Sequence, residues 1–158
     1  ELALAGAVLS HGKESRLFRE LVFERRVALD VEAQQESRQL DSQFAIDVTL
    51  CEGVAPATVL AAIDGVLERF VARPPTRREL QRAISTYESH FVARLELLNR
   101  RAELLNTYWH SLGQPDFVAG DLARYRAATP AAVQAWSARL LRPDRRVVLT
   151  VLPKEVRP

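Results

Sequence analysis

The stretch Gly12–Ala33, GKESRLFRELVFERRVALDVEA, changes its hydrophobic period part-way along. Ser15 is a residue type that often caps a helix, and four apolar residues follow it at helical spacing: Leu17, Phe18, Leu21 and Val22. From residue 27 onward the apolar residues alternate instead, at Val27, Leu29, Val31 and Ala33, which is typical of a strand. The stretch therefore predicts a helix that passes directly into a strand through a charged junction.

Two further alternating runs indicate strands. The run at residues 43–51 follows a polar loop at 34–42 and places four apolar side chains on one face: Phe44, Ile46, Val48 and Leu50. Asp47 and Thr49 fall on the opposite face, so one side of the sheet is expected to be wet or only partly covered. The run at residues 146–152 follows a turn and predicts a third strand.

The remaining segments predict helices. Residues 2–9 indicate the end of a buried helix, and residues 56–71 carry one apolar stripe, at Leu60, Ile63, Leu67 and Phe70. Thr76 and Glu79 form a capping-box pattern that starts a helix predicted to run to about Gly113, with a kink allowed along its length. Its apolar residues recur every three or four positions: Leu80, Ile84, Tyr87, Phe91, Leu95, Leu98, Ala102, Leu105, Trp109 and Leu112. Shorter helices are predicted at 117–126 and after Thr129–Pro130, the latter with Val133, Trp136 and Leu140 inside.

This order of elements predicts an α+β fold. A mostly antiparallel sheet would be covered on one face by helices, including one long helix. The 158 residues, 47% apolar and 27% charged, fit one domain spanning residues 1–158. The sequence contains no methionine, from which we expect it to be a piece of a longer protein.

Composition also excludes several classes of function. The net charge is only +2, and Glu residues are interleaved with Arg at helical spacing, so we expect no nucleic-acid partner. No apolar run approaches the roughly 20 residues of a membrane span. The single Cys51 allows no internal disulfide.

Residue types that carry chemistry are scattered. His11, His90 and His110 lack the spacing of a helical zinc site, and Cys51 has no cysteine partner, so no metal ligand is predicted in this chain. No serine lies in a recognisable nucleophile motif, and no catalytic residue is predicted. Trp109 and Trp136 lie on helical apolar stripes, which favours core packing over a ligand platform.

The order of these motifs resembles the pitrilysin/insulinase family of zinc peptidases, which includes the mitochondrial processing peptidases. SRLFRELVFERRVALDVEA is similar to the family's SRL-(F/Y)-x-x-L segment and the strand that follows it. FAIDVTL resembles the family's second strand, TRRELQRAISTY its T-x-x-E-L-x-x-A helix start, and LLRPDRRVVLTVLPK its closing strand. The resemblance covers nearly the whole chain in the right order.

The resemblance implies a role outside the catalytic half. Members consist of two related halves, of which the first holds zinc through H-x-x-E-H and a distal Glu. The chain resembles the second, non-zinc half, which closes a peptide-binding chamber, and it lacks that half's opening strand. The implied cofactor is zinc in the parent protein and none here. The implied partners are a zinc-bearing N-terminal half-domain or homologous subunit and a peptide substrate. The parent would be a bacterial-type enzyme. Its compartment is not decided by the sequence, and the periplasm is favoured over the cytoplasm.

The resemblance also assigns two positions. Many members carry an Arg and, seven residues later, a Tyr that hold the substrate peptide, and the matching positions here are Val22 and Leu29. Neither side chain donates a hydrogen bond, so a partner subunit would have to supply those groups. The alternative, favoured by their apolar character, is that both are core residues.

Two other interpretations stay open, and one consequence follows for assembly. In the first, the chain is a structural subunit without peptidase activity. In the second, it is a helical module that binds a partner through its long helix. The absent opening strand would leave an unpaired sheet edge, from which we expect self-association.

Overall fold

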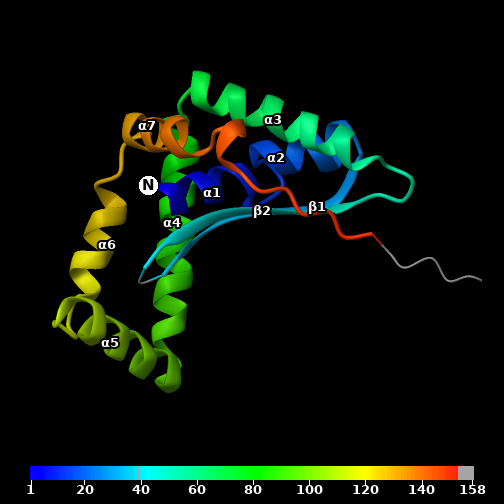
Figure 1. Ribbon diagram of the computed structural model, residues 1–158. Helices are drawn as coiled ribbons and strands as arrows, with labels where there is room; N and C mark the ends of the chain where they lie inside the picture. The colour runs from blue at the N-terminus through cyan, green and yellow to red at the C-terminus, as the bar shows by residue number, and fades with distance from the viewer. Residues whose placement is uncertain (39, 153–158) are drawn as a thin grey trace, which may run out of the picture.

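The helix α1, Leu2–Ser10, lies at the centre of the molecule (Figure 1). The computed structural model describes residues 1–38 and 40–152. Every residue of α1 from Leu4 to Ser10 is buried, because it packs against elements on several sides: β1 (Ala28–Ser37), α2 (Arg16–Phe18), α4 (Arg77–Leu95) and α7 (Pro130–Leu140). The predicted buried helix at 2–9 is therefore confirmed, and it is the element that covers β1.

The other elements surround this centre in chain order. They are the π-helix η1 (Arg19–Glu24), β2 (Ser42–Leu50), α3 (Pro56–Ala72), α5 (Leu98–Leu112), α6 (Val118–Arg126) and the 3₁₀ turn η2 (Pro143–Arg145). In Figure 1, α3 runs along the side of α1 and α2 remote from the sheet, and it packs against η1, α2 and α7. The α+β class is confirmed.

The sheet consists of β1 and β2, paired antiparallel. Both strands reach further into the predicted loop 34–42 than expected, with Ser37 opposite Ser42; Gln39 lies outside the described residues. The apolar row predicted on β2 is confirmed and packs against the core. On α3 the buried row is offset from the predicted one, since Leu60 and Leu67 are half-buried and the buried residues are Val59, Ala62, Ile63, Val66 and Phe70.

The third predicted strand, at residues 146–152, is not formed. This segment is extended, but Val147 is 96% exposed and Leu149 85% exposed. The guanidinium of Arg146 pairs with Asp64 of α3, which starts the segment on the helical layer. A strand requires a hydrogen-bonded neighbour, and none is present in the described part of the chain. Two residues of the motif that predicted it, 153–154, lie outside the described residues.

The helix predicted from Thr76 to about Gly113 begins where expected but is interrupted by more than a kink. It is two helices, α4 and α5, because the backbone at Leu97 is extended, with φ −86° and ψ 121°. The apolar pattern does not reveal this break, since steps of three and four fit two helices as well as one. Tertiary contacts decide it: α5 turns so that Tyr108 packs edge-to-face on Phe117 and donates to Asp121 Oδ2 at 2.8 Å.

Several residues predicted as core are therefore exposed. Phe91 is the last fully buried residue of the α4 stripe, and Leu95 is only half-buried. Trp109 on α5 is 63% exposed and Trp136 on α7 is 43% exposed, although both lie on helical stripes. The exposed apolar residues of the α5 region are Leu97, Leu98, Leu105, Trp109 and Leu112. These stripes predict amphipathic helices correctly but assign too many residues to the core.

One close contact positions α1 against β1. A Cβ placed on Gly6 would lie 2.6 Å from the carbonyl oxygen of Ala33, so only glycine allows this separation. One turn later, Ser10 Oγ accepts a hydrogen bond from the Ala33 N–H at 2.8 Å. The same hydroxyl donates to the Gly6 carbonyl at 3.2 Å. The Ser10 hydroxyl thus links the backbone of α1 to that of β1 at Ala33.

The substitution Gly6→Ala should destabilise the protein by about 1–3 kcal/mol, although alanine favours helix formation, because the added methyl group overlaps the β1 backbone. The matched control is Gly65→Ala in α3, where an added Cβ meets only the guanidinium of Arg69, at 3.4 Å. This control should stabilise the protein by about 0.5–1 kcal/mol. Urea unfolding of the two variants measures both changes, and equal effects at Gly6 and Gly65 would contradict the proposed contact.

Candidate functional site

The two positions assigned by resemblance lie in different environments. Val22 belongs to η1, is half-buried and packs against the core. Leu29 is 64% exposed. It sits at a β-bulge, since Ala28 pairs with Leu50 and Asp30 already pairs with Thr49. The alternative that both are core residues is therefore wrong for Leu29 and right in part for Val22.

Both positions coincide with backbone irregularities. A π-helix and a β-bulge each add a residue to a regular element and redirect its side chains, and both are frequent at functional sites. Between them, Arg26 has φ +55°, the only positive φ of a non-glycine residue in 1–38 and 40–152. The alternation expected from Val27 breaks at the bulge, where Ala28 is buried and Leu29 is not. The bulge therefore turns the Leu29 side chain outward.

The charges at this junction form ion pairs. Glu20 of η1 accepts a hydrogen bond from Arg25 Nε at 2.7 Å and from Arg69 Nη2 of α3 at 2.6 Å. The side chain of Glu20 is only 16% exposed, so both arginines approach a largely desolvated carboxylate. Arg19 and Glu24 pair on the surface at 2.7 Å. The Glu20 contacts attach the irregular segment to α3.

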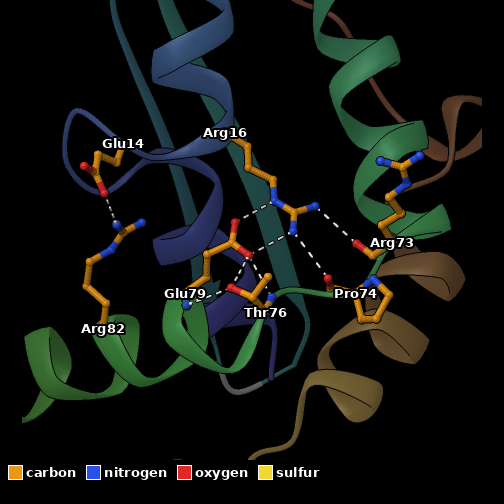
Figure 2. Close-up of polar contacts among 7 residues, drawn as sticks. All are labelled: Glu14, Arg16, Arg73, Pro74, Thr76, Glu79 and Arg82. Atoms are coloured by element: carbon orange, nitrogen blue, oxygen red, sulfur yellow. Dashed lines mark hydrogen bonds and ion pairs between the residues drawn. The ribbon is translucent and has the colours of Figure 1, made fainter.

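Arg16, at the start of α2, joins three segments (Figure 2). Its Nε and Nη2 donate to the two carboxylate oxygens of Glu79 at 2.9 and 3.1 Å. Nη1 donates to the Arg73 carbonyl at 3.2 Å, and Nη2 also reaches the Pro74 carbonyl at 3.4 Å. The guanidinium lies 4.9 Å from the centre of the Phe70 ring, within cation–π range. We call Arg16, Arg73, Pro74, Thr76 and Glu79 the Arg16 network.

The network sits where α3 ends and α4 begins. Thr76 and Glu79 form the predicted capping box: Thr76 N–H donates to Glu79 Oε2 at 2.7 Å, and Glu79 N–H donates to Thr76 Oγ1 at 3.2 Å. Carbonyls at the end of α3 thus face a cation, and N–H groups at the start of α4 face an anion, as the helix dipoles favour. A second ion pair, Glu14 with Arg82 at 3.0 Å, joins the segment between α1 and α2 to α4 (Figure 2).

This arrangement changes the acidity of Glu79. Partial burial disfavours the charged carboxylate, but hydrogen bonds from Arg16 and Thr76 outweigh that effect. Together they lower the pKa of Glu79 from its ordinary 4.5 to about 2. The ionised form is therefore part of the folded structure at neutral pH.

An open groove of about 500 Å³ lies beside the strand that carries Leu29. It is lined by the end of α1, by β1 and by α4, with His11, Asp30, Glu32, Arg82 and His90 among its residues. Side chains of both charges therefore face the groove next to the bulge.

The residues present do not fit a zinc site. Among residues 1–38 and 40–152, no group of three or more His, Cys, Asp or Glu side chains is close enough to hold a metal ion. His11 and His90 share the groove, but no third ligand completes a site there. No helix in the described ranges is long and apolar enough to cross a membrane.

The family of the chain follows from its match to a sequence model. The model described as the Peptidase M16 inactive domain matches residues 1–87, more than half of the chain. The chain belongs to this family. The predicted membership of the non-zinc domain of the pitrilysin/insulinase peptidases is thereby confirmed.

Solved structures share the fold. The inactive peptidase domain of a candidate zinc protease from Bordetella parapertussis has a TM-score of 0.86 at 21% identity, covering 98% of this chain and 84% of that one. A candidate zinc protease from Bordetella pertussis Tohama I has a TM-score of 0.78 at 22% identity, with coverage of 92% and 80%. A Helicobacter pylori protease has a TM-score of 0.78 at 18% identity, and this chain spans only 35% of it. A search of curated proteins found no match.

The M16 motif SRL-F-x-x-L now has a physical explanation in this chain. Ser15 is fully buried, and its hydroxyl donates to the Gly12 carbonyl at 2.7 Å instead of accepting from the helix, as a capping serine would. Arg16 organises the network at Glu79. Leu17 and Leu21 are both completely buried.

Sequence reasoning identified Thr76 and Glu79 but missed their partner Arg16, 63 residues from Glu79. No local signal indicates that pairing. The bulge at Leu29 was missed as well, because an uninterrupted period of two was assumed.

The contribution of Glu79 to stability should depend on pH. Since its folded pKa is lowered, the stabilisation is present above about pH 4.5 and is lost as the pH falls towards 2. Glu79→Gln should therefore cost on the order of 1–2 kcal/mol at pH 7, allowing for solvent screening, and close to nothing at pH 2. Denaturant unfolding of both proteins from pH 7 to pH 2 gives the difference directly.

The control is Glu68→Gln, at an exposed position of α3. It should stay within about 0.5 kcal/mol of the wild type throughout. A pH-independent cost for Glu79→Gln would mean that shape, not charge, is what the network needs.

Proposed function

We propose that this chain is the non-catalytic C-terminal domain of a zinc-dependent metalloendopeptidase, closing a peptide-binding chamber over a zinc site carried elsewhere. The observation that carries the proposal is its membership of the inactive M16 domain family. The two Bordetella structures are of candidate zinc proteases, and one of them is the inactive peptidase domain of such a protease. The zinc would be held by an N-terminal half-domain or a homologous subunit.

The surface around Leu29 supports a role in the chamber. Leu29 projects outward at the bulge, and the groove of about 500 Å³ begins at the next residue along β1, Asp30. A peptide lying there would meet a leucine instead of the tyrosine that relatives carry. With Val22 in place of the relatives' arginine, a charge-assisted hydrogen bond of about 1.5–3 kcal/mol would also be missing from this half. The activity of the parent would then depend on a partner that supplies those groups.

A structural subunit without peptidase activity is the competing function. The specific observation in its favour is that Val22 and Leu29 are both unable to donate a hydrogen bond. The two functions differ in whether the assembled protein cleaves peptides.

The test combines this chain with a zinc-bearing M16 half or subunit from the same genome. We expect the chain alone to bind no stoichiometric zinc and to cleave no peptide from a fluorogenic library. The combination should cleave peptides, and a chelator should abolish that activity. Zinc-dependent cleavage by the chain alone would overturn the proposal, while a stable but inert complex would favour the structural subunit.

The substrate-holding positions give a sharper experiment. In the combined protein, Val22→Arg with Leu29→Tyr should raise kcat/KM by at least about tenfold, because it restores two donors. The matched control, Val22→Leu with Leu29→Phe, preserves bulk without donors and should leave kcat/KM unchanged. Both variants need a check by circular dichroism, since Val22 is half-buried. Equal rates for two folded variants would show that these positions do not contact substrate.

A further inference from the structure

Arg26 occupies a backbone conformation that glycine would adopt more easily. Its φ is +55°, and no other non-glycine residue in the described ranges 1–38 and 40–152 has a positive φ. In this left-handed region an L side chain crowds its own backbone, which makes the conformation rare for arginine. The strain lies at the junction of η1 and β1, the segment that also holds Val22 and Leu29.

The fold requires this backbone conformation but not this side chain. The Arg25 N–H donates to the Glu20 carbonyl at 2.9 Å and closes the last turn of η1. The Val27 N–H then donates back to the Leu21 carbonyl, also at 2.9 Å, so the backbone reverses at the residue between them. Helices commonly end through one left-handed residue of this kind, which is glycine by preference. The presence of an arginine therefore needs an explanation other than the turn.

Within the part of the chain that the structure describes, the guanidinium of Arg26 has no carboxylate partner, and the side chain is exposed. The neighbouring arginines of the junction differ in this respect. Arg19 pairs with Glu24 at 2.7 Å. Arg25 pairs with Glu20, also at 2.7 Å. The planar group of donors on Arg26 is therefore available to a carboxylate from outside the chain.

Arg26 also lies where the candidate site lacks a cation. It comes four residues after Val22, the position at which relatives carry an arginine, and three residues before the outward-facing Leu29. The backbone is fixed on both sides of it, because the Val27 carbonyl accepts a hydrogen bond from the Cys51 N–H at 3.1 Å. A side chain that starts from a fixed point loses less conformational freedom when it holds a ligand.

We propose that Arg26 binds a carboxylate of the peptide substrate, in place of the arginine that is absent at Val22. The assignment rests on the proposed function and adds a substrate class to it: a peptide that brings an acidic side chain or its free C-terminus to the junction. A guanidinium holds a carboxylate through two parallel hydrogen bonds, which also fix the orientation of the peptide. The strained backbone at Arg26 is then a loss of stability that is retained for binding.

Peptide binding and protein stability together test this role. The chain combined with a zinc-bearing M16 half is titrated with three fluorescein-labelled peptides that differ in one group: a glutamate with an amidated C-terminus, a glutamine with an amidated C-terminus, and a glutamine with a free C-terminus. Fluorescence anisotropy gives Kd without turnover. Arg26→Gly should weaken the binding of a carboxylate peptide at least about tenfold and leave the neutral peptide unchanged. Which carboxylate peptide responds shows whether a side chain or the C-terminus is bound.

The same variant should gain stability. Glycine adopts a φ of +55° without strain, so Arg26→Gly should raise the urea midpoint of the chain. Arg26→Asn also tolerates a positive φ but carries no charge, and it should weaken binding as much as Arg26→Gly does. The matched control, Arg78→Gln, removes an exposed arginine from α4 and should change neither Kd nor the urea midpoint.

Three results would overturn the proposal: unchanged binding of the carboxylate peptides by Arg26→Gly, an equal loss of affinity for all three peptides, or a lower urea midpoint, which would mean that the fold needs the side chain. Equal affinity of the unchanged protein for all three peptides would do the same. Cleavage is measured separately. A protein that cleaves peptides whatever residue stands at position 26 retains the proposed function and loses this role of Arg26. Carboxylate-dependent binding without cleavage retains the role of Arg26 and contradicts the proposed function.

Discussion

The separation between α1 and β1 at Gly6 and Ala33 determines how the other elements can pack. Because the helix backbone lies directly against the strand, Ser10 reaches the Ala33 N–H and replaces a neighbouring strand at that point. The remaining sides of α1 are then free to contact α2, α4 and α7. A larger residue at Gly6 would move the central helix outward, and every one of these contacts would have to shift with it.

Features set by neighbouring residues could be predicted from the sequence. The capping box at Thr76, the cap at Thr129 with Pro130, and the alternation along β2 all depend on residues a few positions apart, and all three are present. Features set by distant partners could not. The break at Leu97 depends on contacts between α5 and α6, and the unpaired state of residues 147–152 depends on which strand lies alongside.

The candidate site shows the same division. Resemblance to the M16 peptidases located Val22 and Leu29, but it carried no information about the bulge that exposes one and the π-helix that holds the other. The charges of the junction act through Glu20, which lies between Arg25 and Arg69. A pairing of that kind needs three-dimensional proximity, which charge patterning alone does not provide.

The arm formed by α5 and α6 has a consequence for how the molecule opens. Several of its apolar residues face solvent. Tyr108 donates to Asp121 within the arm, and α6 is attached to α4 by the ring of Tyr125, stacked on Tyr87 at 3.6 Å, and by the ion pair of Arg126 with Glu88 at 2.6 Å. Local unfolding starts where little apolar surface is buried. We therefore expect the arm to open at a lower cost in free energy than the centre of the molecule, so that its amide protons exchange with solvent while those of α1 and the sheet remain protected.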